Sequence, residues 1–327
     1  MTEEGKSYIC EICGAEVKVV RKTVSDPNCP TLTCCGKPMQ QKAQRKLSDS
    51  EIKQAVKERY GKCAEAGTTT ASCCCPSDAP RSSGFATEHG LYTPEDLSLI
   101  PEISLSLARG CGNPTGFAAL KAEDFVVDFG CGAGIDVILA AQKVAPTGKV
   151  IGVDFTSEMI VSAKEAVAEA GFSDAVEFRV ADLDQTGLPT SVADVLISNC
   201  VINLCPDKVA VYREAFRILK PGGRLAISDI VYTEKIDPNV HKRFQTTWSG
   251  CVGGAIDKDS YFEAINNVGF AEIHLVAQHL LASKELEEMA CCPGPEYTPL
   301  PKKGDIALVQ DKVASIKFTA VKPHISG

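Results

Sequence analysis

Hydrophobic and polar positions alternate in a regular way from residue 90 onward. Short apolar runs with strand character cover residues 125–129, 149–154, 176–180, 193–198, 224–230, 271–277 and 314–321. Longer segments with helical periodicity lie between the earlier ones, at residues 136–144, 157–170 and 207–220. Strands that alternate with helices are typical of a parallel sheet covered on both faces. We therefore predict a doubly wound α/β sheet whose last two strands form a terminal hairpin.

The first 89 residues do not follow this alternation. Residues 48–60 have the pattern of a charged amphipathic helix, and residues 61–84 are rich in Gly, Ser, Thr and Cys, as in a loop. We divide the chain into a small cysteine-paired domain (1–45), a helix with a cysteine-rich loop or lid (46–89), the α/β core (90–235) and a C-terminal part (236–327).

A glycine-rich loop follows the first predicted strand of the core. Its sequence is Gly130-Cys131-Gly132-Ala133-Gly134, and a helix comes after it. A dinucleotide fingerprint requires Gly or Ala where this chain has Ile135, so a pyrophosphate is disfavoured. The loop suits a ligand whose amino-acid end lies across the glycines.

Acidic residues stand at the ends of the neighbouring strands. Asp128 is near the end of the first strand, Asp154 ends the second and is placed to accept hydrogen bonds from a ribose diol, and Asp182 follows the third, where it could edge an adenine. Together with the loop, these residues indicate S-adenosylmethionine. We therefore predict that residues 90–235 form a class I methyltransferase core of Rossmann-like type, with Asp128, Gly130, Gly132, Gly134, Asp154 and Asp182 as candidate cofactor-binding residues.

Two cysteine pairs stand on glycine turns near the N-terminus. The pair Cys10 and Cys13 is spaced CxxC, and Cys34 and Cys35 are adjacent. Four thiolates complete a tetrahedral site for zinc or iron, and metal binding would supply the folding energy of so short a domain. The pattern resembles the desulforedoxin-type iron domain. A redox-inert structural metal, an electron-transfer site and loose thiols all remain open from the residues alone.

The number of cysteines and the net charge indicate the cellular compartment of the protein and exclude some classes of partner. Sixteen of the 327 residues are cysteine, and the first residues lack a basic stretch followed by an apolar run, so we expect no signal peptide, reduced thiols and a cytoplasmic protein. The formal net charge of -8 argues against nucleic-acid and anionic-membrane partners. No apolar run approaches the roughly 20 residues of a membrane helix.

Further cysteines stand around the predicted core. Cys200 follows the strand that should line the methyl-transfer site, whereas Cys111 and Cys251 lie in glycine turns, which we expect to expose their thiols. The triplet Cys73, Cys74 and Cys75 falls in the accessible loop. A single cysteine is often only a small buried hydrophobic residue, but several near one edge favour a soft metal or metalloid.

Residues 50–323 resemble the arsenite methyltransferase family over nearly their whole length. The matching segments are Tyr60-Gly61-Lys62, the cysteine-rich loop, Gly110-Cys111-Gly112-Asn113-Pro114, residues 128–136, residues 152–159, residues 198–204 and Gly250-Cys251-Val252-Gly253-Gly254. The resemblance implies that Cys111, Cys200 and Cys251 hold trivalent arsenic and that one of residues 73–75 supports the cycle. Met159 and Asn199 lie in matched segments and join the candidate cofactor-binding residues. An alternative role for Asn199 is to orient Cys200. The N-terminal cysteine pairs and Cys291-Cys292 depart from the family pattern.

The expected reaction transfers methyl groups from S-adenosylmethionine to thiolate-bound arsenite and gives methylated arsenicals, a detoxification. Arsenic(III) bound by three thiolates keeps a lone pair that serves as nucleophile. Thioredoxin or a small thiol is the expected reductant, because methylation formally oxidises arsenic. The alternatives are a methyltransferase for a carbon or oxygen substrate and a non-catalytic metalloid-binding protein.

Overall fold

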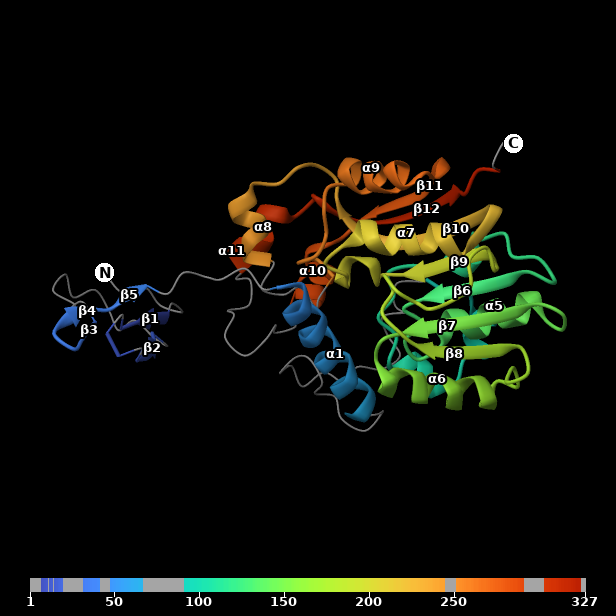
Figure 1. Ribbon diagram of the computed structural model, residues 1–327, viewed down its shortest axis with the longest axis horizontal. Coiled ribbons are helices and arrows are strands. Elements are labelled where there is room, and N and C mark those ends of the chain that lie inside the picture. The colour runs from blue at the N-terminus through green and yellow to red at the C-terminus, as the bar shows by residue number, and fades with distance from the viewer. Residues whose placement is uncertain are drawn as a thin grey trace. The chain divides into compact units, whose positions relative to one another are not determined.

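The computed structural model describes residues 7–10, 12–13, 15–19, 32–41, 48–66, 91–244, 251–290 and 303–324. The chain divides into two compact units, Met1–Ser48 and Asp49–Gly327 (Figure 1). Each unit is described by itself.

The first unit is built from very short strands. β1 (Ser7–Ile9) pairs antiparallel with both β2 (Glu16–Lys18) and β5 (Gln40–Gln41), and β3 (Thr33–Cys34) pairs with β4 (Lys37–Pro38). Among the residues of this unit that the structure describes, Tyr8, Cys10 and Met39 form a buried cluster. Domains as short as this one commonly rely on a metal or on disulfides for part of their stability.

The second unit contains a seven-stranded sheet in the order β11-β12-β10-β9-β6-β7-β8. The strands are β6 (Phe125–Phe129), β7 (Lys149–Asp154), β8 (Val176–Val180), β9 (Ala193–Asn199), β10 (Leu219–Tyr232), β11 (Ala271–Leu280) and β12 (Val313–Val321). The strands from β10 to β8 are parallel, whereas β12 runs antiparallel to both of its neighbours, β10 and β11. The predicted doubly wound α/β class is confirmed.

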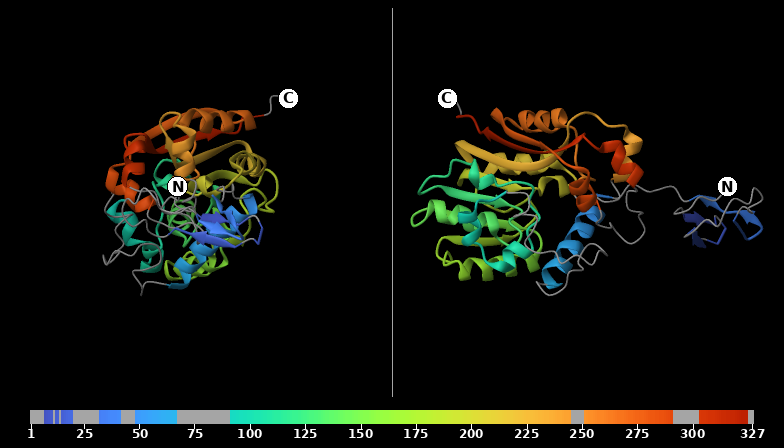
Figure 2. Two further views of the ribbon diagram at one scale, coloured as in Figure 1. Left: turned by 90° about the vertical axis from the view of Figure 1, so that its left-hand side faces the viewer. Right: turned by 180° about the vertical axis from the view of Figure 1, so that it is seen from behind.

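Helices cover both faces of this sheet, as Figures 1 and 2 show. α5 (Ile135–Val144) and α6 (Ser157–Glu169) pack on one face, and α7 (Lys208–Ile218) and α9 (Lys258–Val268) pack on the other. Alternate residues of β6 divide between the two cores: Val126 belongs to the α5 side, and Val127 to the α7 side. This period of two is what a strand buried on both faces requires. The remaining described helices are α1 (Asp49–Ala66), α3 (Pro94–Ser98), α4 (Glu102–Ser106), η2 (Pro114–Gly116), η3 (Ile202–Leu204), α8 (Pro238–Phe244), α10 (Ser283–Ala290) and α11 (Lys303–Val309).

Helix α1 is longer than the sequence indicated. Residues from Gly61 to Ala66, expected to begin a loop, continue the helix. Ile52, Val56 and Cys63 are buried at helical spacing, so tertiary packing of this face overrides the low helix propensity of glycine. A Cβ atom at Gly61 would lie 3.6 Å from the Glu158 carboxylate of α6. Cys63, placed in the loop by the sequence, is disulfide-bonded and packs beside Leu107, Ala133 and Met159.

One other expectation is wrong in detail. α7 ends at Ile218 rather than near residue 220, because Leu219 already pairs with Ala193 and β10 runs on through the Pro-Gly-Gly segment with a register shift.

The last two strands, β11 and β12, pair antiparallel as predicted for a terminal hairpin. The connection between them is long and contains α10 and α11. In the sheet, β12 lies between β10 and β11.

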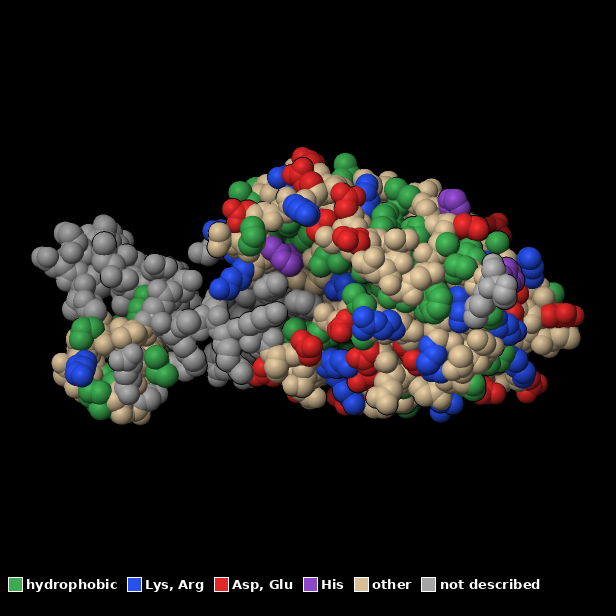
Figure 3. Space-filling model, turned by 45° about the horizontal axis from the view of Figure 1, so that its top comes forward, with side chains coloured by type: hydrophobic (Ala, Val, Ile, Leu, Met, Phe, Trp, Pro, Cys, Tyr) green, Lys and Arg blue, Asp and Glu red, His purple; other side chains and the backbone are tan. Residues whose placement is uncertain are grey.

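Among the described helices, none is long and apolar enough to cross a membrane. On the face shown in Figure 3, acidic and basic side chains of the second unit are interspersed.

Candidate functional site

The loop between β6 and α5 is shaped by its glycines. Gly130, Gly132 and Gly134 all have positive φ angles, of 75°, 48° and 91°, a region that glycine adopts without steric cost. Gly130 also meets a close neighbour, because a Cβ atom there would lie 2.5 Å from Val201. At Gly132 the corresponding space is open within 4 Å. The loop thus leaves its backbone accessible to a ligand.

Asp154 at the end of β7 is tied to this loop. One carboxylate oxygen accepts from the amide of Gly132 at 3.0 Å, and the other accepts from the amide of Thr156 at 2.9 Å. Burial raises the pKa of Asp154, and these backbone donors oppose the rise. Each carboxylate oxygen has a second lone pair, so Asp154 can still accept hydrogen bonds from a ligand diol.

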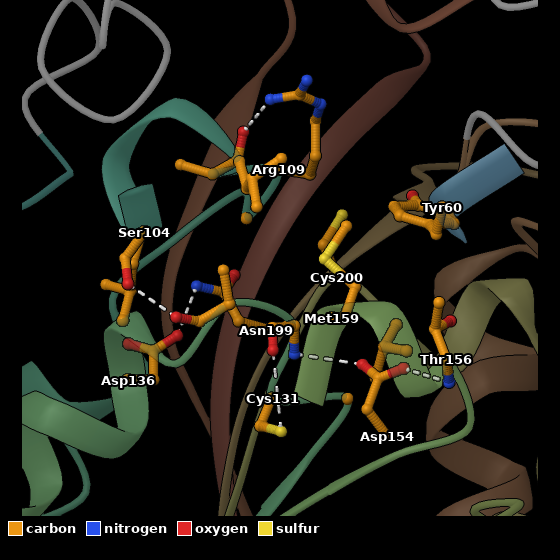
Figure 4. Close-up of a pocket in the computed structure, with 18 of the residues that line it drawn as sticks. Tyr60, Ser104, Arg109, Cys131, Asp136, Asp154, Thr156, Met159, Asn199 and Cys200 are labelled. Carbon is orange, nitrogen blue, oxygen red and sulfur yellow. Dashed lines mark hydrogen bonds between the residues drawn. The ribbon is translucent and has the colours of Figure 1, made fainter. Parts of the chain in front are cut away.

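A cavity opens beside the loop (Figure 4), and its empty volume of about 810 Å³ includes the solvent at its open side. Figure 4 shows Asp154 with Thr156 at one side of the cavity and Asp136 with Asn199 at the other. Of the predicted cofactor-binding residues, the lining includes Gly130, Gly132, Asp154, Met159 and Asn199. It also includes residues that were not among the predicted site residues: Tyr60, Tyr92, Ser104, Arg109, Asp136 and Thr156.

Three predicted cofactor-binding residues lie outside this lining. Gly134 caps the start of α5. Asp182 forms an ion pair with Lys53 of α1 at 3.0 Å and lines a second cavity, which also includes Gly130 and Asp154. Asp128 is buried, and its pKa is raised well above the ordinary value by burial and by the charges of Asp136 and Asp154.

Asp136 and Tyr92 are the most informative residues that the sequence analysis missed. Burial raises the pKa of Asp136 to about 6, while hydrogen bonds from Asn199 and Tyr92 favour its charged form. The Tyr92 hydroxyl donates to Asp136 at 3.3 Å. A usable signal was present for Asp136, since it lies in the first turn of the helix that follows the glycine loop. No local pattern marks Tyr92.

The three cysteines predicted to hold arsenic come from segments far apart in the chain. Cys111 precedes β6, Cys200 follows β9, and Cys251 lies between α8 and α9. Their exposed fractions are 5%, 4% and 6%. The expectation that glycine turns expose the thiols of Cys111 and Cys251 is therefore wrong.

The glycines beside Cys111 serve close packing instead. A Cβ atom at Gly110 would lie 2.4 Å from the Asn199 amide nitrogen, and one at Gly112 would lie 2.1 Å from the Ser228 hydroxyl oxygen. Real Cβ contacts are never this short, so these positions allow the backbone to press against β9 and β10. This approach carries the Cys111 thiol inward.

The thiols influence one another. The pKa of Cys200 is raised well above its ordinary value by its interactions with the thiols of Cys111 and Cys251 and by burial. Burial also raises the pKa of Cys111. Of these three cysteines, Cys200 alone lines the 810 Å³ cavity. Cys200 therefore connects the cluster of three cysteines (Cys111, Cys200 and Cys251) to the candidate cofactor site.

Backbone hydrogen bonds hold Cys111 and Cys200 against the sheet. The amide of Cys200 donates to the carbonyl oxygen of Ser228 on β10 at 2.8 Å. The Ser315 hydroxyl of β12 donates to the carbonyl oxygen of Cys111 at 2.9 Å. The main chains of Cys111 and Cys200 are thus anchored to the central sheet, whereas Cys251 is held through its thiol, which donates to the carbonyl oxygen of Cys200.

The first unit gathers its own thiols. The sulfur atoms of Cys10, Cys13, Cys34 and Cys35 all lie within 4.8 Å of one another. Backbone amides of Cys13 and Ile12 lower the pKa of Cys10 to about 7, whereas hydrogen bonds with neighbouring thiols raise that of Cys34 to about 12. Four clustered sulfur donors fit a tetrahedral zinc or iron ion. Cys73, Cys74, Cys75, Cys291 and Cys292 lie outside the described residues.

The parallel sheet, the glycine loop and the tethered Asp154 are features of the class I methyltransferase fold. A family model described as a methyltransferase domain matches residues 120–269. The crystal structure of an arsenic(III) S-adenosylmethionine methyltransferase from Chlamydomonas reinhardtii has a TM-score of 0.55 at 24% identity, covers 76% of each chain, and supports the fold.

Two curated relatives of this chain are arsenite methyltransferases. The arsenite methyltransferase of Halobacterium salinarum is 38% identical over 237 residues, which make up 69% of this chain and 59% of that protein. The arsenite methyltransferase of Aquipseudomonas alcaligenes is 34% identical over 232 residues, or 68% of this chain and 63% of that protein. This chain is similar to both arsenite methyltransferases, and it spans about three fifths of the length of each of them.

Proposed function

We propose that this protein transfers methyl groups from S-adenosylmethionine to arsenite. The observation that carries the proposal is the position of Cys200, whose thiol lines the cofactor cavity and interacts with the thiols of Cys111 and Cys251. Three thiols match the three bonds of trivalent arsenic, a soft centre that prefers sulfur. A site for an ordinary carbon or oxygen acceptor has no need for this arrangement.

The residues around the cavity fit the methyl donor. Asp154 offers free lone pairs for a ribose diol, and Asp136 offers a carboxylate for an ammonium group. Asp182 and Leu183 line the adjoining cavity, where an adenine edge would lie. When bound, S-adenosylmethionine supplies an electrophilic methyl group on a sulfonium centre.

Burial of the thiols suits the uptake of arsenous acid. The raised pKa values keep Cys111 and Cys200 protonated before binding. Each thiol proton leaves with one hydroxide of As(OH)3 as water while a sulfur–arsenic bond replaces an oxygen–arsenic bond. Three thiols thus give As(SR)3 and three waters with no net release of protons. A dedicated general base is not required for this step.

The three thiols then hold the arsenic with its lone pair free to act as the nucleophile. The backbone anchors of Cys200 on β10 and of Cys111 on β12 restrict where that lone pair can lie. Such positioning can lower a barrier by about 7 to 11 kcal/mol. We propose that placement is the main catalytic contribution of this chain.

Methylated arsenic is pentavalent, and two electrons return it to the trivalent state. Two thiols that close a disulfide provide these electrons, and thioredoxin or a small thiol reopens the disulfide by exchange. Cys73, Cys74 and Cys75 remain candidates for this step. The need for reduced thiols places the reaction in the cytoplasm.

We further propose that the cysteines of the first unit bind zinc or iron. A unit of this length commonly depends on a metal for its stability, and its four clustered sulfur atoms supply suitable ligands. A zinc ion there would restrict the site to a structural role, because zinc has no accessible redox chemistry. An iron ion would permit one-electron transfer.

The test is incubation of the purified protein with arsenite, S-adenosylmethionine and a thiol reductant. Arsenic species are separated by chromatography and quantified with element-specific detection. Methylated arsenic from the wild type and little from Cys200→Ser would support the proposal. Absence of methylated arsenic from the wild type, with cofactor bound and reductant in excess, would refute it.

A further inference from the structure

Asn199 lies between the cluster of three cysteines and the cofactor cavity. It ends β9 and immediately precedes Cys200. Its side-chain oxygen accepts from the amides of Cys111 at 3.0 Å and Gly112 at 3.2 Å. Its side-chain nitrogen donates to the carbonyl oxygen of Gly112 at 2.7 Å. These bonds clamp the turn that carries Cys111 against the strand end that carries Cys200.

The same amide nitrogen also reaches toward the cofactor cavity. It donates to the Asp136 carboxylate at 2.9 Å and lies 3.1 Å from the Tyr92 hydroxyl oxygen. Both Asp136 and Tyr92 line the cofactor cavity. A hydrogen bond to an ionised carboxylate is about twice as strong as a neutral one. The orientation of the Asn199 amide is therefore set by groups that a cofactor would touch.

Close packing leaves this amide little freedom. A Cβ atom at Gly110 would lie 2.4 Å from its nitrogen and 2.8 Å from its oxygen, so the turn rests directly on the amide. Rotation of the amide would exchange donor and acceptor and break the bonds to both Cys111 and Asp136. The turn and the carboxylate thus favour the same amide orientation.

We infer that Asn199 is a positioning residue that couples the two sites, so that binding of the methyl donor in the cavity strengthens binding of arsenite at Cys111, Cys200 and Cys251. The inference rests on the proposed function and deepens it. A ligand ammonium group beside Asp136 favours its charged form, which in turn holds the Asn199 amide in the orientation that fixes the Cys111 turn. Such linkage is reciprocal: arsenite strengthens binding of the cofactor by the same factor.

The coupling is measured without turnover. The dissociation constant of arsenite is determined by equilibrium dialysis with element-specific detection, in the presence and absence of saturating S-adenosylhomocysteine, which has no methyl group to transfer. We expect the wild type to bind arsenite at least about fivefold more tightly with S-adenosylhomocysteine, the lower end of typical couplings. In Asn199→Ala the ratio of the two constants should fall to about one.

Two further variants separate coupling from simple destabilisation. Asp136→Asn retains the shape of the carboxylate but removes its charge, so it should also reduce the ratio, and it serves if Asn199→Ala does not fold. Asn113→Ala is the control, because this second asparagine of the same loop caps η2 through a 3.0 Å bond from Gly116. Asn113→Ala should retain the wild-type ratio.

The outcomes distinguish this inference from the proposed function. A purely structural role of Asn199 would weaken arsenite binding equally with and without S-adenosylhomocysteine, and an unchanged ratio in both Asn199→Ala and Asp136→Asn would overturn the inference. A wild-type ratio of one would also overturn it, even if the wild type methylates arsenite. Failure of the wild type to methylate arsenite, by contrast, would refute the proposed function itself.

Discussion

The thiol of Cys251 donates a hydrogen bond to the backbone carbonyl oxygen of Cys200 at 3.3 Å, although 51 positions separate the two residues. Both residues have left-handed backbone conformations, with φ angles of 66° and 61°. Such conformations cost non-glycine residues on the order of 1 to 3 kcal/mol and persist where the surroundings enforce them. The fold therefore maintains this pair of cysteines at an energetic cost.

The number of thiols determines how strongly each arsenical binds. We expect Cys251→Ser to weaken arsenite binding by on the order of 100-fold, the equivalent of about 3 kcal/mol, because one of three sulfur–arsenic bonds is lost. Monomethylarsenite takes only two thiols, so its affinity should fall less. Dialysis of both arsenicals against the variant checks this expectation, and equal losses for the two arsenicals would argue against a three-thiol site.

The glycines of the Cys111 turn should resist even a single added methyl group. In Gly112→Ala the new Cβ atom would meet the Ser228 hydroxyl oxygen at 2.1 Å, and overpacking of this kind costs about 1 to 3 kcal/mol. Gly304→Ala is the control, since nothing lies within 4 Å of its added Cβ atom. Urea unfolding of both variants measures the difference, and equal stability of the two would contradict the close approach seen here.

The buried Asp229 should make stability depend on pH. Its carboxylate accepts from the Tyr261 hydroxyl at 2.8 Å and from the amide of Ile230 at 2.9 Å, and burial raises its pKa from 3.8 to about 6. The folded state therefore holds this proton more tightly than the unfolded state. The resulting stabilisation is complete below pH 4 and is lost as pH rises through about 6, a change of roughly 3 kcal/mol.

Asp229→Asn removes this titration and retains an acceptor. The free energy of unfolding of the variant minus that of the wild type should therefore be larger at pH 8 than at pH 4, because only the wild type loses stability as the pH rises. Urea denaturation at both values tests this. A difference between variant and wild type that does not change with pH would show that Asp229 titrates normally.

Metal removal should affect the first unit selectively. We expect a strong chelator, or Cys13→Ser, to abolish metal binding and to unfold the unit of residues 1–48, because so short a unit commonly depends on its metal for folding. The calorimetric transition of the second unit should remain. Elemental analysis before chelation distinguishes zinc from iron, and a purified full chain that carries no metal yet shows both transitions would contradict the proposed site.

Much of the core could be predicted because its signals are local. Buried strands such as β6 read as continuous apolar runs, and Asp154 follows such a run directly. The inward position of Cys111 could not be predicted, because it depends on the approach of Gly110 and Gly112 to Asn199 and Ser228, which are distant in sequence.

Other features were hidden for the same reason. The continuation of α1 past Gly61 depends on packing against α6, and the insertion of β12 beside β10 depends on strand pairing. Tyr92 reaches Asp136 only through the tertiary fold. Sequence pattern thus predicted the elements, whereas their contacts determined the site.

The left-handed backbone of Cys200 and Cys251 has a further consequence. Because both residues are buried and their backbone conformation is set by folding, part of the ordering entropy of a chelate is already lost when the protein folds. A metalloid that binds there immobilises few additional bonds, as with a rigid macrocyclic ligand. The site should therefore retain arsenic at concentrations at which flexible dithiols release it.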